Sequence, residues 1–300
     1  MLNPIERKNF MRRFVSALLC AVLLLSVLAA CEEEDVPTIS FAGNQVPVLE
    51  HVPVNSYSAE AFSAENGAVT YRDKRARYGV DVSSHQREID WTAVKESGID
   101  FAIIRAGYRG YGSDGLIHED PYFRKNMEGA LAAGLDVGVY FFSQATSAEE
   151  AAEEAGYLLW LIEDYHSAIT YPVVYDWERI TDAQARTDGV ERAQLTDFAV
   201  AFCQEVRAAG YTPAVYFNQD LGYLSYDLSR LTDCALWLAE LGEKPDFYYD
   251  FQIWQYTHTG TVPGISTTVD RNISFVNYGS AAGGKKIDRV SPGGSARDGR

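Results

Sequence analysis

Residues that build metal sites are scarce in this sequence. Its 300 residues include four cysteines and five histidines. The histidines are dispersed and form no H-x-H or H-E-x-x-H pattern, which are spacings typical of zinc sites. The sequence therefore predicts no metal and no other cofactor. His85 lies close to Asp81 in the chain, and we interpret it as a polar residue of a loop.

Basic residues are also few. There are 26 Lys and Arg against 42 Asp and Glu, which gives a formal net charge of −16. A nucleic-acid-binding protein normally presents a basic face, so this balance argues against a nucleic-acid partner. It also repels anionic membranes and polymers at long range, so attachment to a surface would need something other than bulk charge. The 47% hydrophobic fraction indicates a globular chain with a sizeable core.

Long apolar runs are limited to residues 14–30, which are short for a membrane-spanning helix and typical of an export signal. Four basic residues precede the run: Arg7, Lys8, Arg12 and Arg13. The run ends in Leu28-Ala29-Ala30-Cys31, which resembles the lipobox of bacterial lipoproteins. The resemblance implies that residues 1–31 are a signal peptide, that Cys31 carries lipid, and that the protein is exported and anchored on the outer side of the cell membrane, facing the cell wall. An ordinary signal peptide or an uncleaved anchor is the alternative.

The segments that flank the predicted domain have no sustained hydrophobic period. Residues 32–77 contain three prolines and begin with a run of acids, so they are predicted to form a flexible tether. Such a tether would have an r.m.s. reach of roughly 35–40 Å. Residues 279–300 are rich in Gly and Ser with scattered basic residues, and they are predicted to form a disordered tail.

Residues 78–278 are the predicted domain, which holds 31 acidic and 13 basic residues, a balance of −18. Short β-favouring runs recur in it. The eight runs are 78–82, 101–105, 136–142, 172–176, 213–217, 235–239, 252–256 and 267–270. Helix-like segments lie between the first six runs. They are 90–97, 120–133, 147–164, 191–209 and 221–231.

This alternation predicts right-handed β-α-β units and a parallel sheet. Asp120-Pro121 places a capping residue before a proline, and Gly98, Gly134 and Gly210 each lie just past a helix-like segment. Eight strands in about 200 residues indicate an α/β fold with a single TIM-like barrel whose later helices are reduced or lost.

Acidic residues stand at the ends of three of these strands. Asp176 and Glu178 are two residues apart, so in a strand their side chains share one face. Asp81 lies near the end of the first strand and Asp270 at the end of the last, and these strands are neighbours in a closed barrel. Because barrel enzymes carry their chemistry at the C-terminal ends of the strands, the four acids are candidates for one site. Carboxyl groups in unequal environments, one of them protonated, are what glycoside hydrolysis requires.

Aromatic and amide residues near the strand ends could line a sugar-binding groove. Sugar rings pack their CH faces on aromatic rings, while their hydroxyl groups need polar partners. The candidate aromatic residues are Tyr140, Phe142, Tyr216, Trp237, Trp254 and Tyr256, and the candidate polar partners are Gln86 and Gln255. Core packing is the alternative for each aromatic residue.

The domain also resembles a known family. Matching motifs occur in order at 81–86 with 89–91, 120–123, 138–143, 172–178, 254–256 and 269–272. Together they are similar to glycoside hydrolase family 25, the N-acetylmuramidase lysozymes. The resemblance implies a barrel of five β/α units plus three strands, and cleavage of the β-1,4 bond between N-acetylmuramic acid and N-acetylglucosamine in peptidoglycan glycan strands. It also implies Glu178 as general acid, with Asp81, Asp176 and Asp270 as the other acids. The chain departs from the family at Arg87, where a glycine is common.

Two mechanisms remain open at this point. Either a second carboxylate activates water with inversion, or the 2-acetamido group of the substrate attacks while Asp176 orients it. The D-x-E spacing favours the assisted version. The assisted chitinase-type enzymes carry a longer acidic series before their Glu, and residues 171–175 contain no acid, which argues against that family.

Two other functions are alternatives to a membrane-tethered muramidase. One is a peptidoglycan-binding lipoprotein without catalysis, which would typically lose the proton donor. The other is a structural lipoprotein that spaces the wall from the membrane. We expect a monomer. Cys203 and Cys234 lie in the domain, and a disulfide between them or two buried free thiols are both compatible with the sequence.

Overall fold

The computed structural model describes residues 36–181, 183–281 and 288–289. The predicted signal peptide with Cys31, and residues 32–35, lie outside the described residues. The chain divides into two units, one up to Val48 and one from Leu49 onward. In the first unit, β1 (Thr38–Phe41) and β2 (Asn44–Pro47) form an antiparallel hairpin. No helix in the described ranges is both long and apolar enough to cross a membrane.

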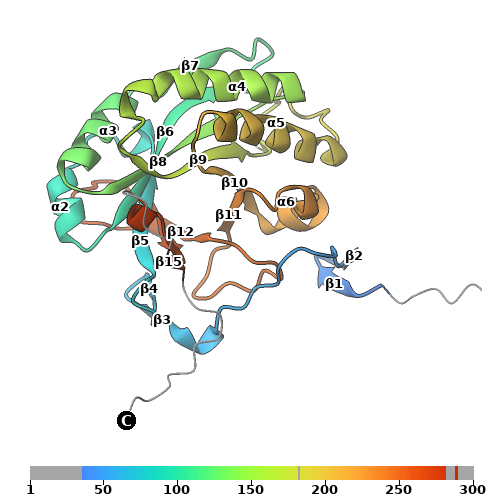
Figure 1. Cartoon of the computed structure of the whole chain (residues 1–300), viewed down its shortest axis with the longest axis horizontal. Coiled ribbons are helices and arrows are strands. Elements are labelled where there is room, and N and C mark those ends of the chain that lie inside the picture. Colours follow the sequence, from blue (N-terminus) through green and yellow to red (C-terminus); the bar gives the residue numbers. More distant parts are fainter. Residues whose placement is uncertain (1–35, 182, 282–287, 290–300) are drawn as a thin grey trace, which may run out of the picture. The chain divides into compact units, whose positions relative to one another are not determined.

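The second unit contains a closed barrel of eight strands, which confirms the predicted fold class (Figure 1). The barrel strands are β5 (Arg77–Val82), β6 (Phe101–Arg109), β8 (Asp136–Ser143), β9 (Ile169–Trp177), β10 (Pro213–Asn218), β11 (Ala235–Ala239), β12 (Ile253–Gly260) and β13 (Val269–Ser274). Pairing between β5 and β6 closes the ring. The short strand β7 (Ile117–Glu119) extends β6 as an antiparallel hairpin.

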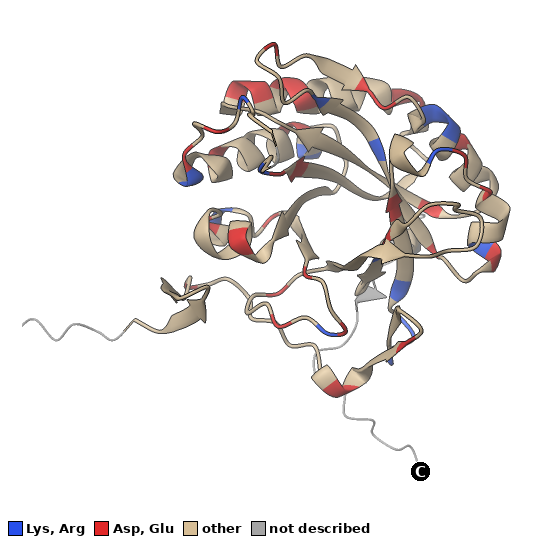
Figure 2. Cartoon of the chain, turned by 180° about the vertical axis from the view of Figure 1, so that it is seen from behind, with Lys and Arg blue, Asp and Glu red and all other residues tan. Residues whose placement is uncertain are grey.

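Helices connect the strands from β5 to β11, as the sequence predicted. They are α2 (Trp91–Glu96), α3 (Phe123–Ala132), α4 (Ala148–Leu161), α5 (Leu195–Ala208) and α6 (Gln219–Leu224). Asp90 and Ser147 cap α2 and α4 by accepting hydrogen bonds from backbone N–H groups. Gly98, Gly134 and Gly210 have φ values of 92°, 75° and 87°, so each adopts the left-handed conformation that ends a helix. Acidic residues are spread over the helices and loops (Figure 2).

The last strand departs from the predicted parallel arrangement. β13 pairs antiparallel with both β12 and β5, whereas the other pairings in the barrel are parallel. Only residues 261–268 separate β12 from β13. A parallel crossover needs about a dozen residues or more, so this connection can only reverse the chain.

The prediction of a flexible tether is wrong for residues 49–77, which we call the N-terminal cover. It contains the hairpin of β3 (Phe62–Glu65) and β4 (Ala68–Tyr71). The ring of Tyr57 stacks on Phe275 with centroids 3.9 Å apart, and the ring of Phe62 meets Trp254 at 5.4 Å. No α-helix follows β11, β12 or β13 in the described chain to cover these aromatic residues, so the cover buries them instead.

The disordered-tail prediction is also wrong where the structure describes that segment. β14 (Val276–Asn277) pairs antiparallel with β15 (Asp288–Arg289). A 3₁₀ helix spans Tyr278–Ala281. Residues 282–287 and 290–300 lie outside the described residues.

The N-terminal ends of the strands are closed by packed aromatic rings. Phe101 stacks on Tyr171 with ring centroids 4.3 Å apart, and Tyr278 packs on Tyr171 at 5.2 Å. All three side chains are buried in one apolar cluster with Trp237 and Val174. Because this end of the barrel is filled, a ligand can enter only from the C-terminal ends of the strands.

Candidate functional site

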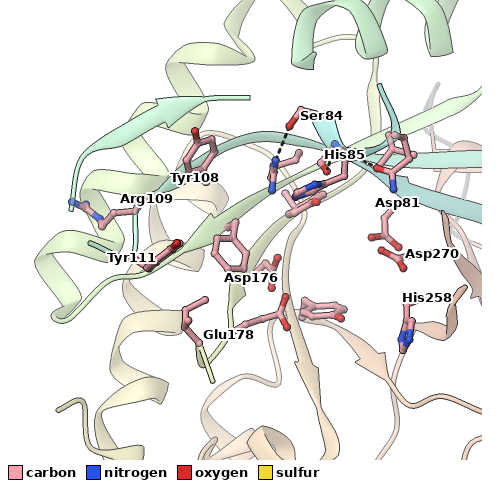
Figure 3. Close-up of a pocket in the computed structure, with 18 of the residues that line it drawn as sticks. Asp81, Ser84, His85, Tyr108, Arg109, Tyr111, Asp176, Glu178, His258 and Asp270 are labelled. Atoms are coloured by element: carbon pink, nitrogen blue, oxygen red, sulfur yellow. Dashed lines mark hydrogen bonds between the residues drawn. The ribbon is translucent and has the colours of Figure 1, made fainter. Parts of the chain in front are cut away.

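A cavity of about 930 Å³ opens at the C-terminal ends of the barrel strands. Asp81, Asp176, Glu178 and Asp270 all line it, so the structure brings together the four acids that the sequence singled out (Figure 3). They come from β5, from the end of β9, and from β13. This is the size of cavity that binds a ligand of several rings.

Strand β9 aims two of these acids into the cavity by simple alternation. Tyr175 packs outward on Phe202 of α5, and the Trp177 indole donates a hydrogen bond to the carbonyl of Ala145. Asp176 lies between these two residues and Glu178 follows Trp177, so both acids face inward. The side chain of Asp176 is buried and its Oδ1 has no hydrogen-bond partner. An unpaired buried acceptor is costly, so its position in a cavity indicates a partner supplied by a ligand.

The other two acids form a pair across neighbouring strands. Asp81 and Asp270 lie opposite each other in the antiparallel register of β5 and β13, and their carboxyl groups are hydrogen-bonded. The Oδ2 atom of Asp81 also accepts hydrogen bonds from Asn272 Nδ2 at 2.7 Å and from Gln255 Nε2 at 3.1 Å. Asp81 is thus held by three partners.

Two aromatic residues orient the amides that hold Asp81. The Tyr216 hydroxyl donates to Gln255 Oε1 at 2.9 Å, which leaves the Nε2 group of Gln255 to donate to Asp81. The Trp237 indole donates to Asn272 Oδ1 at 2.9 Å in the same way. The network fixes which end of each amide faces the carboxylate.

Burial and mutual repulsion raise the pKa values of all four acids. Burial is the largest cause for each group. The charge of Asp270 adds to the rise in the pKa of Asp81, and the charge of Asp81 adds to the rise in that of Glu178. Glu178 in turn raises the pKa of Asp176. The pocket therefore keeps protons at pH values where isolated carboxyl groups have lost them, as a proton donor requires.

Backbone contacts hold the Glu178 segment in place. Gln144 Nε2 donates to the carbonyl of Glu178 at 2.8 Å. Arg186 donates to the carbonyl of Gln144 at 2.8 Å and forms an ion pair with Glu150 of α4 at 2.6 Å. These contacts tie the loop after β9 to α4, so the position of Glu178 depends on residues outside the cavity.

Six of the eight aromatic and amide residues that the sequence offered for a sugar-binding groove line the cavity. They are Gln86, Tyr140, Phe142, Tyr216, Trp237 and Gln255. The prediction is wrong for Trp254, and Tyr256 is likewise turned away from the cavity. Both alternate with the inward-facing Gln255, so they point to the outer side of β12. The Trp254 indole donates to the Glu240 carbonyl there and its ring packs on Phe62.

The structure adds cavity residues that the sequence reasoning missed. They include Arg105, Tyr108, Tyr111, Ile180 and His258, together with His85, which was interpreted as a loop residue. The Arg105 side chain forms an ion pair with the buried Asp120 at 2.8 Å. The Tyr111 side chain is 50% exposed. Its loop leads into β7, a strand that the sequence did not predict, so nothing in the pattern placed it at the cavity.

The departure at Arg87 has a structural consequence. Arg87 has φ 56° and ψ −128°, a conformation that glycine adopts easily and other residues rarely do. This position therefore suits the glycine that the resemblance led us to expect. Ser83 and Gln86 form a reciprocal capping box just before it, and Gln86 also donates to the carbonyl of Thr268 at 3.3 Å. These contacts hold the strained loop beside Asp81.

The two remaining predictions concern cysteines and metals. Cys203 and Cys234 are free thiols, and their side chains are hydrogen-bonded to each other. Of the two arrangements that the sequence allowed, the structure has the thiols, with Cys203 buried and Cys234 partly exposed.

Within the described residues no group of three or more His, Cys, Asp or Glu is arranged to hold a metal ion.

The sequence of this chain is similar to a known family and to characterised proteins. Residues 80–265 match the family model described as "Glycosyl hydrolases family 25". The chain is 28% identical over 216 residues to the "Autolytic lysozyme" of Clostridium acetobutylicum, covering 72% of this chain and 60% of that protein. It is also 28% identical over 209 residues to "Lysozyme M1" of Streptomyces globisporus, covering 65% of this chain and 66% of that protein. The alignment thus spans slightly less than two thirds of either lysozyme.

The fold has relatives among solved structures. A family 25 glycosyl hydrolase from Bacillus anthracis superimposes with a TM-score of 0.56 at 23% sequence identity, covering 73% of this chain and 97% of that one. At this identity the likeness concerns the fold. It supports the barrel described above, whose predicted form is five β/α units followed by three strands.

Proposed function

Because the chain belongs to glycosyl hydrolase family 25, we propose that it is a peptidoglycan hydrolase, a muramidase. The reaction is cleavage of the β-1,4 bond between N-acetylmuramic acid and N-acetylglucosamine. One observation carries the proposal: four carboxyl groups from three distant segments converge in one cavity, where burial raises their pKa values. Such a cluster supplies both a proton donor and negative charge beside a glycosidic bond.

We assign the proton donor to Glu178. It is partly buried and lines the cavity, and burial raises its pKa, which favours the protonated form that a proton donor needs. Its side chain would donate to the oxygen of the leaving sugar.

We assign a different role to Asp176. Its unpaired Oδ1 is an acceptor in need of a donor, and the N–H of a 2-acetamido group is such a donor. This supports the substrate-assisted mechanism, in which Asp176 orients the acetamido group as it attacks and stabilises the positive charge that develops. Asp81 and Asp270 contribute negative charge from the opposite strands.

Digestion of purified peptidoglycan tests the activity. The products are reduced and analysed by mass spectrometry to identify the sugar at each new reducing end. A muramidase leaves N-acetylmuramic acid at those ends. New ends of N-acetylglucosamine, or binding without any new ends, would overturn the proposal. The second outcome would favour a non-catalytic binding protein, which the inward orientation of all four acids speaks against.

We further propose that the protein is an exported lipoprotein, anchored through Cys31 on the outer side of the cell membrane and facing the wall. The lipobox-like residues before Cys31 support this. The wild type should incorporate a palmitate analogue, and Cys31→Ala should release the protein from membranes or leave it unprocessed. Exported wild type without label would contradict the anchor. We propose that the enzyme acts as a monomer, since a single chain supplies all four acids that the proposed reaction uses.

A further inference from the structure

The N-terminal cover is fixed to the barrel next to the cavity. Its hairpin of β3 and β4 precedes residues 80–265, which match the family model, so the hairpin is an addition to the matched domain. The Tyr256 hydroxyl is hydrogen-bonded to the backbone of Val69 in β4, and the Phe62 ring packs on Trp254. The hairpin is therefore held by buried contacts on β12 and has a defined position.

A second cavity, of about 460 Å³, lies between this hairpin and the barrel. We call it the cover pocket. It is lined by hairpin residues Ala64, Glu65, Asn66, Gly67 and Val69, by Leu241, Gly242 and Glu243 after β11, and by Tyr256, Thr257, His258 and Thr259 of β12. His258 also lines the cavity that contains the four acids, which we call the central cavity. A polymer that leaves the central cavity past His258 would pass beside the cover pocket, which shares this residue.

Figure 3 shows where this exit lies. His258 and Tyr111 are on opposite sides of the four acids in that view. Both residues line the central cavity, so the cavity has one end at the loop after β6 and another at β12. The cover pocket adjoins the second end at His258 and includes hairpin residues that precede the matched domain.

The chemistry of the cover pocket favours a cationic group. Two carboxylates, Glu65 and Glu243, line it, and none of the lining residues is Lys or Arg. Lys244 follows Glu243 in the chain and does not line the pocket. Leu241 is 55% exposed and offers an apolar contact, while Thr257 and Thr259 offer hydroxyl groups. A flexible aliphatic side chain that ends in an ammonium group matches this combination.

We propose that the cover pocket binds the peptide arm of peptidoglycan, with the free ammonium group of its diamino acid placed between Glu65 and Glu243. This inference rests on the proposed function, because it takes peptidoglycan as the substrate. It makes the enzyme selective for glycan strands that still carry their peptides. The anionic surface that repels the polymer as a whole would then attract its one cationic group.

The test compares three substrates: soluble glycan strands with uncross-linked peptides, the same strands with the ammonium groups acetylated, and strands stripped of peptide by an amidase. Both kcat/KM and Kd are measured for each. The wild type should favour the first substrate over the other two by about threefold to tenfold, the range for two exposed ion pairs. The double variant Glu65→Gln/Glu243→Gln should lose most of this preference.

A matched control variant distinguishes the effect of the cover pocket from the effect of the net charge of the protein. Glu96→Gln/Glu163→Gln removes two exposed carboxylates from the helical side of the barrel and changes the net charge equally. It should keep the wild-type preference. A wild type that does not distinguish acetylated from free peptides, or a pocket variant that keeps the full preference, would overturn the inference. A wild type that cleaves no substrate overturns the proposed function instead, and the Kd values still decide the pocket.

Discussion

The two pairs of acids in the cavity differ in how their oxygens are satisfied. Asp81 of the β5–β13 pair is held by Asn272, Gln255 and Asp270. In the β9 pair of Asp176 and Glu178, the Oδ1 atom of Asp176 has no partner. A satisfied carboxylate holds its geometry and supplies charge, whereas an unsatisfied one is available to a substrate. The comparison assigns the reacting groups to β9 and the electrostatic support to β5 and β13.

Glu178→Gln should have the largest effect on activity. The amide keeps the shape of the side chain and loses the transferable proton. General-acid catalysis contributes about 10²–10⁴-fold, so kcat on purified peptidoglycan should fall by at least that order. Binding to peptidoglycan and the melting temperature should stay close to wild type. Near wild-type turnover in a folded variant would contradict the assignment of Glu178 as the proton donor.

Asp176→Asn should have the second largest effect on activity. Loss of one preorganised electrostatic partner typically lowers kcat by about 10²–10³-fold. The same variant should be more stable than wild type at alkaline pH. The raised pKa of Asp176 means that its contribution to stability is full below the unfolded value, near 4, and is lost as pH rises through the folded value.

The asparagine carries no charge at any pH, so this loss disappears in the variant. Thermal unfolding at pH 5 and pH 8 measures it. The melting temperature of wild type should fall between these values more than that of Asp176→Asn. Parallel curves for the two proteins would show that Asp176 is not a strained, buried acid.

Asp81→Asn should change the pH dependence of kcat. We expect this change to be a clearer sign of the role of Asp81 than the fall in the rate itself. The charge of Asp81 helps to raise the pKa of Glu178, so its removal lowers that pKa. Glu178 then loses its proton at a lower pH, and the alkaline limb of kcat against pH moves to lower pH. An alkaline limb that stays in place, or moves upward, would separate Asp81 from the electrostatics of Glu178.

Asn272→Ala should have the smallest effect of the four. It removes the 2.7 Å bond to Asp81 and leaves the indole N–H of Trp237 without its acceptor. An unsatisfied buried donor costs about 1–3 kcal/mol, so the free energy of unfolding should fall by that amount. Activity should fall by about tenfold or less, because Gln255 still holds Asp81. A loss of activity as large as that of Asp176→Asn would contradict the distinction between the pair Asp81 and Asp270 and the pair Asp176 and Glu178.

The strands and the four acids could be predicted because their signals are local. Alternation in β9 places Asp176 and Glu178 on one face whatever the rest of the chain does. For β12, however, the sequence indicated a strand without indicating which residues face the cavity. A shift of one position exchanges Gln255 for Trp254, and only the packing of Phe62 on Trp254 decides the matter.

The N-terminal cover escaped prediction for a related reason. Its anchors Tyr57, Phe62 and Tyr71 are spaced without helical or strand period, so they gave no signal by themselves. They are buried or partly buried because they pack on aromatic residues at the last strands, after which the described chain has no α-helix. The need for a cover becomes visible only when the barrel is assembled.

The separate roles of Glu178 and Asp176 are tested most directly by how the rate of each variant depends on the leaving group. Wild type, Glu178→Gln and Asp176→Asn are compared on glycan strands and on a nitrophenyl β-glycoside of an N-acetylmuramic-acid-terminated saccharide. Nitrophenolate leaves without protonation, so the deficit of Glu178→Gln should shrink there to about tenfold or less, against about 10²–10⁴-fold on glycan strands. Asp176→Asn should stay impaired on both substrates. Equal deficits of Glu178→Gln on the two substrates would contradict its assignment as the proton donor.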